Sequence, residues 1–83
     1  MKRNAASPQL LLESIRIQNG SADLLPYHQQ RVNRSRKVLF PKSPSLKLAE
    51  VVASMELPRI GTYKLRLEYG EKVEKHELVP YHV

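Results

Sequence analysis

Apolar and charged residues alternate strictly near the end of this chain. One set of alternate positions holds only Tyr and Leu and the other only charged side chains: Tyr63, Leu65, Leu67 and Tyr69 against Lys64, Arg66 and Glu68. Side chains of a β-strand point alternately to the two faces of its sheet, so this pattern predicts a strand with one buried and one solvated face. Such a strand needs neighbouring strands and a second layer that covers its apolar face.

Turn signals predict an antiparallel partner for this strand and a second hairpin near the start. A tight turn over residues 69–72 leads into a predicted strand over residues 73–79, which Pro80 closes. The Leu- and Ile-rich segment 9–17 is followed by Asn19-Gly20, the strongest short signal for a two-residue hairpin turn. A short return strand over residues 21–24 completes this first hairpin.

Two helices are predicted between the hairpins. Residues 27–40 contain no Gly or Pro, Pro26 suits a first helical position, and Pro41 ends the segment. A second helix is expected to be capped by Ser45 and to end at Pro58. The sequence therefore predicts an α+β two-layer sandwich in the order ββααββ, an antiparallel sheet with both helices on one face. Residues 9–83 are expected to form this single domain, and residues 1–8 are expected to be a flexible leader.

Composition narrows the classes of function. The chain of 83 residues is long enough for one small domain, and none of its apolar runs approaches the roughly 20 residues that cross a bilayer. It has no cysteine, which excludes disulfides and thiolate metal sites, and we expect a cytoplasmic protein without membrane contact. The formal net charge of +6 favours anionic partners.

The first helix carries the most informative cation. On a helical wheel with about 100° per residue, Leu25, Val32 and Leu39 mark the buried direction, and Arg31 falls within the inward arc. Arg36 is expected to be solvated, as are Arg34 and Lys37. An inward arginine keeps its charge and needs an anion. Two anions remain open from spacing alone: Glu13, which interrupts the apolar face of the first strand, and a bound phosphate.

The remaining polar residues give weaker signals. The three histidines, His28, His76 and His82, lack the spacing of a metal site, and His28 is expected to form a hydrogen bond near the core. Lys64 and Arg66 are expected on a solvated strand face, or beside a substrate carboxylate if that face lines a cleft. The sequence has none of the common catalytic motifs, and its cations are not interleaved with aromatic residues, so we do not expect nucleic-acid binding as the main role.

Two stretches together resemble a known family. Residues 12–20, with Glu13-x-x-Arg16 before a Gly turn, and residues 25–35, with His28-x-x-Arg31, resemble the N-terminal domain of the class-IV aminotransferases. These are the fold-type-IV enzymes that use pyridoxal phosphate, and the likeness is nearest to short members such as aminodeoxychorismate lyase. Residues 61–69 and 78–81 are similar to the family's last hairpin.

The resemblance implies a function for the complete protein. Arg31 would bind the phosphate of pyridoxal 5'-phosphate, and Lys64 and Arg66 would be substrate contacts by position only. The family's Schiff-base lysine belongs to a following domain that this chain lacks, so the chain alone is expected to have no catalytic residue, to bind no cofactor and to be inactive. The resemblance implies half of an aminotransferase or 4-amino-4-deoxychorismate lyase, a homodimer formed through the sheet or the helices, with an amino-acid-like substrate. The alternative is a non-catalytic basic module that binds nucleic acid or a protein.

Overall fold

The computed structural model describes residues 10–81 as an antiparallel sheet with two helices. The order along the chain is ββααββ, as the sequence predicts, so the expected α+β fold is confirmed. The predicted leader, residues 1–8, lies outside the described residues. The elements are β1 (Leu11–Gln18), β2 (Ser21–Ala22), α1 (Leu25–Leu39), α2 (Leu48–Ala53), β3 (Thr62–Tyr69) and β4 (Val73–Pro80).

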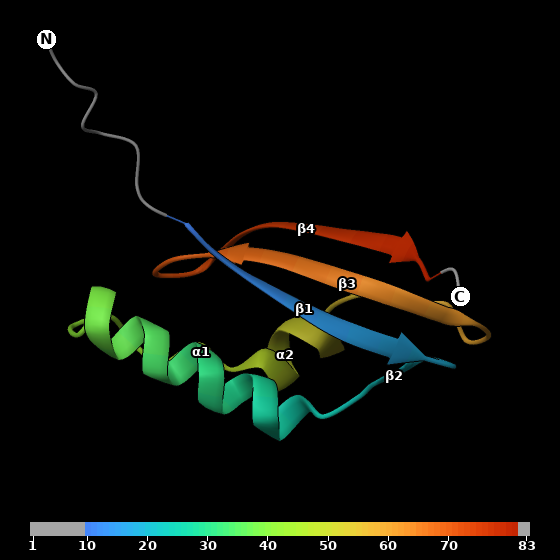
Figure 1. Ribbon diagram of the computed structural model, residues 1–83, viewed down its shortest axis with the longest axis horizontal. Helices are drawn as coiled ribbons and strands as arrows, with labels where there is room; N and C mark the ends of the chain where they lie inside the picture. Colours follow the sequence, from blue (N-terminus) through green and yellow to red (C-terminus); the bar gives the residue numbers. More distant parts are fainter. Residues whose placement is uncertain (1–9, 82–83) are drawn as a thin grey trace, which may run out of the picture.

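The four strands lie in the order β2-β1-β3-β4, and all neighbours are antiparallel. Both helices lie on one side of this sheet (Figure 1). β1 and β3, the two central strands, pair along their whole length from Leu11 opposite Tyr69 to Gln18 opposite Thr62. One strand of the first hairpin thus pairs with one strand of the last hairpin in the middle of the sheet, and the helices between them in sequence cover one of its faces.

The first hairpin turn has the backbone that its sequence predicts. Asn19 and Gly20 both have positive φ, 49° and 85°, which suits the right-handed twist of the flanking strands. Asn19 also fixes the loop before β3: its backbone N–H donates to the carbonyl oxygen of Gly61 at 2.9 Å, and its side-chain oxygen accepts from the N–H of Gly61 at 3.0 Å. The turn therefore joins two segments that lie far apart in the sequence.

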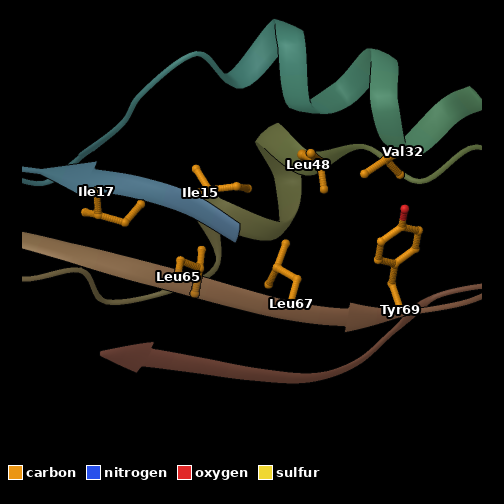
Figure 2. Packing of buried hydrophobic residues seen from close by; sticks show 7 residues of the cluster. All are labelled: Ile15, Ile17, Val32, Leu48, Leu65, Leu67 and Tyr69. Carbon is orange, nitrogen blue, oxygen red and sulfur yellow. The ribbon is translucent and has the colours of Figure 1, made fainter. Parts of the chain in front are cut away.

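The core is one row of side chains between the sheet and the helices (Figure 2). Its seven members are at most 2% exposed, and they come from both central strands and both helices: Ile15, Ile17, Val32, Leu48, Leu65, Leu67 and Tyr69. The strand members occupy alternate positions, which confirms the period of two that the sequence shows. Burial of each aliphatic side chain stabilises the fold by about 1.5–3 kcal/mol.

The limits predicted for the second helix are wrong at both ends. α2 starts at Leu48 after Lys47, not at Ser45, and it has no side-chain cap of its own. Gln29 of α1 caps this helix from outside. Its Oε1 accepts a hydrogen bond from the N–H of Leu48 at 2.7 Å, and its Nε2 donates one to the carbonyl oxygen of Leu46 at 2.8 Å. The helix ends before Ser54, whose hydroxyl donates to the carbonyl oxygen of Val51 at 2.7 Å.

Candidate functional site

A carboxylate lies under α1, where the apolar row of β1 is interrupted. Glu13 is only 4% exposed, and it occupies the inward position two residues before Ile15. A buried carboxylate requires partners, and α1 supplies two of them. Nδ1 of His28 donates a hydrogen bond to Oε2 of Glu13, and Nε of Arg31 lies 3.5 Å from Oε1. The hydrogen bond expected for His28 near the core is therefore confirmed.

Arg31 lies at the edge of the sandwich rather than inside it. Its side chain is 50% exposed, so the expectation that it points into the core is wrong. One terminal nitrogen, NH1, lies 3.4 Å from the hydroxyl oxygen of Tyr27 and donates to it, and the guanidinium carbon is 5.8 Å from the centre of the Tyr27 ring. The hydrogen bond with Tyr27 and the charge of Glu13 raise the pKa of Arg31 above its ordinary value, so the guanidinium stays charged.

The environment of Arg31 leaves part of its hydrogen-bonding capacity unused. Nε faces Glu13 and NH1 faces Tyr27, whereas NH2 has no hydrogen bond or ion pair within residues 10–81. An arginine can bind two oxygens of one anion in parallel. The internal pair with Glu13 is thus present, and the exposed half of the guanidinium remains able to bind an anion from solvent.

Arg36 is the arginine that the fold buries. It is 5% exposed, although a solvated side chain was expected. Its Nε donates to the carbonyl oxygen of Gly70 at 2.9 Å and its NH2 to that of Glu71 at 2.6 Å. On the wheel Arg36 lies about 40° from the buried Val32, and Arg31 lies about 100° from it. A modest error in the assumed direction of the core therefore assigns the buried position to Arg31 instead of Arg36. The acceptors belong to a distant turn, and nothing in the helix sequence indicates them.

Tyr69 adds a second polar group to the layer that holds Glu13. Its ring stands on β3, and its hydroxyl points toward α1 (Figure 2). Burial raises the pKa of Tyr69, against the opposing effect of a hydrogen bond with Ser35. Tyr69 therefore stays neutral across the ordinary pH range. The sequence pattern identified it as a core residue but did not indicate its contact with α1.

Lys64 and Arg66 lie on the face of the sheet that the helices do not cover. Both are exposed and alternate with the buried Leu65 and Leu67, so the sheet separates them from Arg31. NH1 of Arg66 lies 3.8 Å from Oε1 of Glu77 in β4, a weak ion pair. A hollow of about 520 Å³ on this side is lined by residues of both charge signs: Arg66, Glu68, Glu74, Lys75, His76 and Glu77. A role for Lys64 and Arg66 in substrate binding stays a prediction.

Other kinds of site find little support in residues 10–81. No group of three or more His, Asp or Glu side chains there is placed to hold a metal ion. None of the helices in this part of the chain has the length and apolar character that a membrane span requires. Arg34 and Lys37 are exposed on α1, as expected.

Comparison with known proteins gives one informative match. No protein-family model matches the chain, and no curated protein matches it. Among solved structures, the chain is similar to the crystal structure of a putative 4-amino-4-deoxychorismate lyase from Haemophilus somnus 129PT, with a TM-score of 0.69 and 30% sequence identity. The match covers 89% of this chain and 41% of that one, so the chain spans less than half the length of its relative. The resemblance to the N-terminal domain of the class-IV aminotransferases, which the sequence predicts, is thereby confirmed over most of the chain.

Proposed function

We propose that this chain is one half of a pyridoxal-phosphate-dependent lyase or aminotransferase, and that Arg31 contacts the phosphate of the cofactor. The observation that carries the proposal is a permanently charged, half-exposed guanidinium that Glu13 and Tyr27 hold in place. The similarity of the chain to the structure of a putative 4-amino-4-deoxychorismate lyase gives the chemical context. The substrate of the complete protein would be an amino-acid-like molecule such as 4-amino-4-deoxychorismate.

The residues present fit one part of a phosphate site. A phosphate dianion accepts several hydrogen bonds, and Arg31 has a terminal nitrogen without a partner among the described residues. Glu13 and Tyr27 restrict the rotamers of Arg31, so less side-chain entropy is lost when an anion binds. Pyridoxal phosphate, when bound, supplies an electron sink for reactions at the α-carbon of an amino acid. The other groups of the site would come from a second domain.

We further propose that the chain alone does not catalyse a reaction. A lysine that bonds to the cofactor needs a desolvated, preassembled pocket. Lys64 is exposed on the open face of the sheet, on the side away from Arg31. The lysine would therefore belong to a second domain.

Isotope-edited NMR of the 83-residue chain tests the role of Arg31. The chain holds only part of the site and is not expected to retain the cofactor stably by itself, so the test uses a large excess of pyridoxal phosphate. Under this excess we expect weak binding that shifts the Nε–H signal of Arg31 and the amide signals around Tyr27 in a saturable way. Pyridoxal, which lacks the phosphate, should leave these signals unchanged. Arg31→Gln should abolish the shifts, whereas Arg34→Gln, which removes an exposed charge from another side of α1, should retain them.

Two results would contradict the proposal. If Arg34→Gln weakened binding as much as Arg31→Gln, the ligand would be responding to the general positive charge of α1. If pyridoxal phosphate gave a stable visible absorbance that Lys64→Ala abolished, the chain would carry its own reactive lysine, and the claim of inactivity would be wrong.

A further inference from the structure

Glu13 connects two side chains of α1 that differ in their access to solvent. Its carboxylate oxygens are divided between them: Oε2 accepts a hydrogen bond from Nδ1 of His28, and Oε1 lies 3.5 Å from Nε of Arg31. The side chains of Glu13 and His28 are only 3% and 12% exposed, whereas that of Arg31 is 50% exposed. The carboxylate thus links a buried imidazole to a guanidinium that solvent can reach.

The contact between Arg31 and Glu13 is the weaker of the two. A distance of 3.5 Å exceeds the usual range of an N–H···O hydrogen bond, so these two groups interact mainly through their charges. Within residues 10–81, Glu13 is the only carboxylate that forms an ion pair with Arg31. Glu13 is therefore the group that competes with an external anion for this guanidinium.

The protonation of His28 changes the net charge of this group of side chains. When the imidazole is neutral, its Nδ1–H donates to Glu13, and the charges of Glu13 and Arg31 cancel. A second proton, on Nε2, leaves that hydrogen bond in place and adds one positive charge. The three side chains then carry one net positive charge instead of none. Because Glu13 and His28 are buried, water screens their interaction less than it would at the surface.

The other titratable groups near His28 do not supply the same change. Tyr27, its neighbour on α1, places its ring edge-on to the imidazole, with 5.5 Å between the ring centres. Burial raises the pKa of Tyr69 in β3, so its hydroxyl stays neutral where histidines titrate. Asp23, the acid that precedes α1, is bound by Arg16 at 2.8 Å. Among these groups, a histidine is the one that ordinarily changes its charge near neutral pH.

We infer that His28 is a positioning residue for the anion contact of Arg31: when protonated, it engages Glu13 more strongly and raises the affinity of Arg31 for a phosphate dianion. This inference rests on the proposed function and adds its regulation by pH. Coupling between two bound species is reciprocal, so a bound dianion should in turn favour the protonated imidazole. Anion binding should weaken as the pH rises through the titration of His28.

Sulfate is the probe for this coupling, because it stays a dianion where the phosphate of pyridoxal phosphate itself titrates. With a large excess of sulfate at constant ionic strength, the Nε–H signal of Arg31 gives the dissociation constant at each pH. The ring signals of His28 report its protonation in the same samples. We expect the dissociation constant to rise roughly tenfold as His28 loses its proton. Arg31→Gln should abolish the sulfate-dependent shifts of the amide signals around Tyr27.

Two histidine variants form a matched pair. His28→Gln keeps a side-chain N–H donor for Glu13 but cannot gain a charge, so we expect weak sulfate binding that no longer changes with pH. His76→Gln removes an exposed histidine of β4 and should keep the full change. A third measurement needs no variant: in the wild-type chain without sulfate, the Nε–H signal of Arg31 should shift with the same midpoint as the ring signals of His28.

The outcomes separate this inference from the proposed function. Sulfate binding at Arg31 that is equally strong at every pH would overturn the inference and leave the proposed function intact. The same holds for a pH dependence that persists in His28→Gln, or for an Arg31 signal that ignores the titration of His28 in the chain without sulfate. Absence of sulfate binding at Arg31 at every pH would contradict both.

Discussion

Nε of Arg36 in α1 lies 2.9 Å from the carbonyl oxygen of Gly70, in the turn between β3 and β4. This bond fastens the last turns of the helix to the far end of the sheet. A Cβ on Gly70 would lie 3.2 Å from the ring of Phe40, a tight contact to which the ring would have to yield by a few tenths of an ångström. The buried charge of Arg36 meets carbonyl dipoles, and no carboxylate within residues 10–81 forms an ion pair with it.

Replacement of Arg36 should destabilise the fold. Arg36→Met keeps much of the apolar side chain but removes two charge-assisted hydrogen bonds, so we expect the free energy of unfolding to fall by about 1.5–3 kcal/mol. Urea denaturation measures the change. Arg34→Met removes an exposed arginine from the same helix and should change the stability by less than about 0.5 kcal/mol. Equal effects of the two variants would show that Arg36 is not buried in the turn.

The difference between Arg31 and Arg36 marks the limit of sequence analysis for this chain. Apolar alternation in Tyr63–Tyr69 and the Asn19-Gly20 turn specify faces and hairpins locally, and these predictions are confirmed. The rotation of α1 about its axis depends instead on acceptors in a turn about 34 residues away, which a wheel does not include. An error of a few tens of degrees in the predicted orientation of α1 is enough to predict burial for the half-exposed Arg31 and exposure for the buried Arg36.

The start of α2 could not be predicted for a similar reason. Ser45 is a good capping residue by its type, but the N–H of Leu48 is satisfied by Gln29 from another helix. Gln29→Ala should therefore lower the free energy of unfolding by about 1–2 kcal/mol, because it releases both the N–H of Leu48 and the carbonyl oxygen of Leu46. Thermal denaturation with Gln30→Ala, an exposed neighbour, as the control would check this. A smaller loss for Gln29→Ala than for Gln30→Ala would contradict it.

His28 should matter to stability through the carboxylate that it binds. His28→Ala leaves the buried Glu13 with only the longer contact to Arg31, so we expect a loss of about 1–3 kcal/mol in the free energy of unfolding. Glu13→Gln in the same chain should recover part of that loss, since it removes the buried charge. A double-mutant cycle measures this coupling, and strictly additive effects of the two substitutions would argue against a direct bond between them.

Tyr69 should make the stability fall at alkaline pH. Burial raises its pKa in the folded state, so the unfolded chain ionises first, near the ordinary value of about 10. The contribution of Tyr69 to stability is therefore complete below pH 10 and decreases as the pH rises above it. Tyr69→Phe should flatten this decrease. Urea denaturation at several pH values between neutrality and 11 measures the effect, and Tyr81→Phe, which alters a half-exposed tyrosine, is the matched control. If the alkaline decrease were as steep in Tyr69→Phe as in the wild type, the hydroxyl of Tyr69 would not be buried against α1.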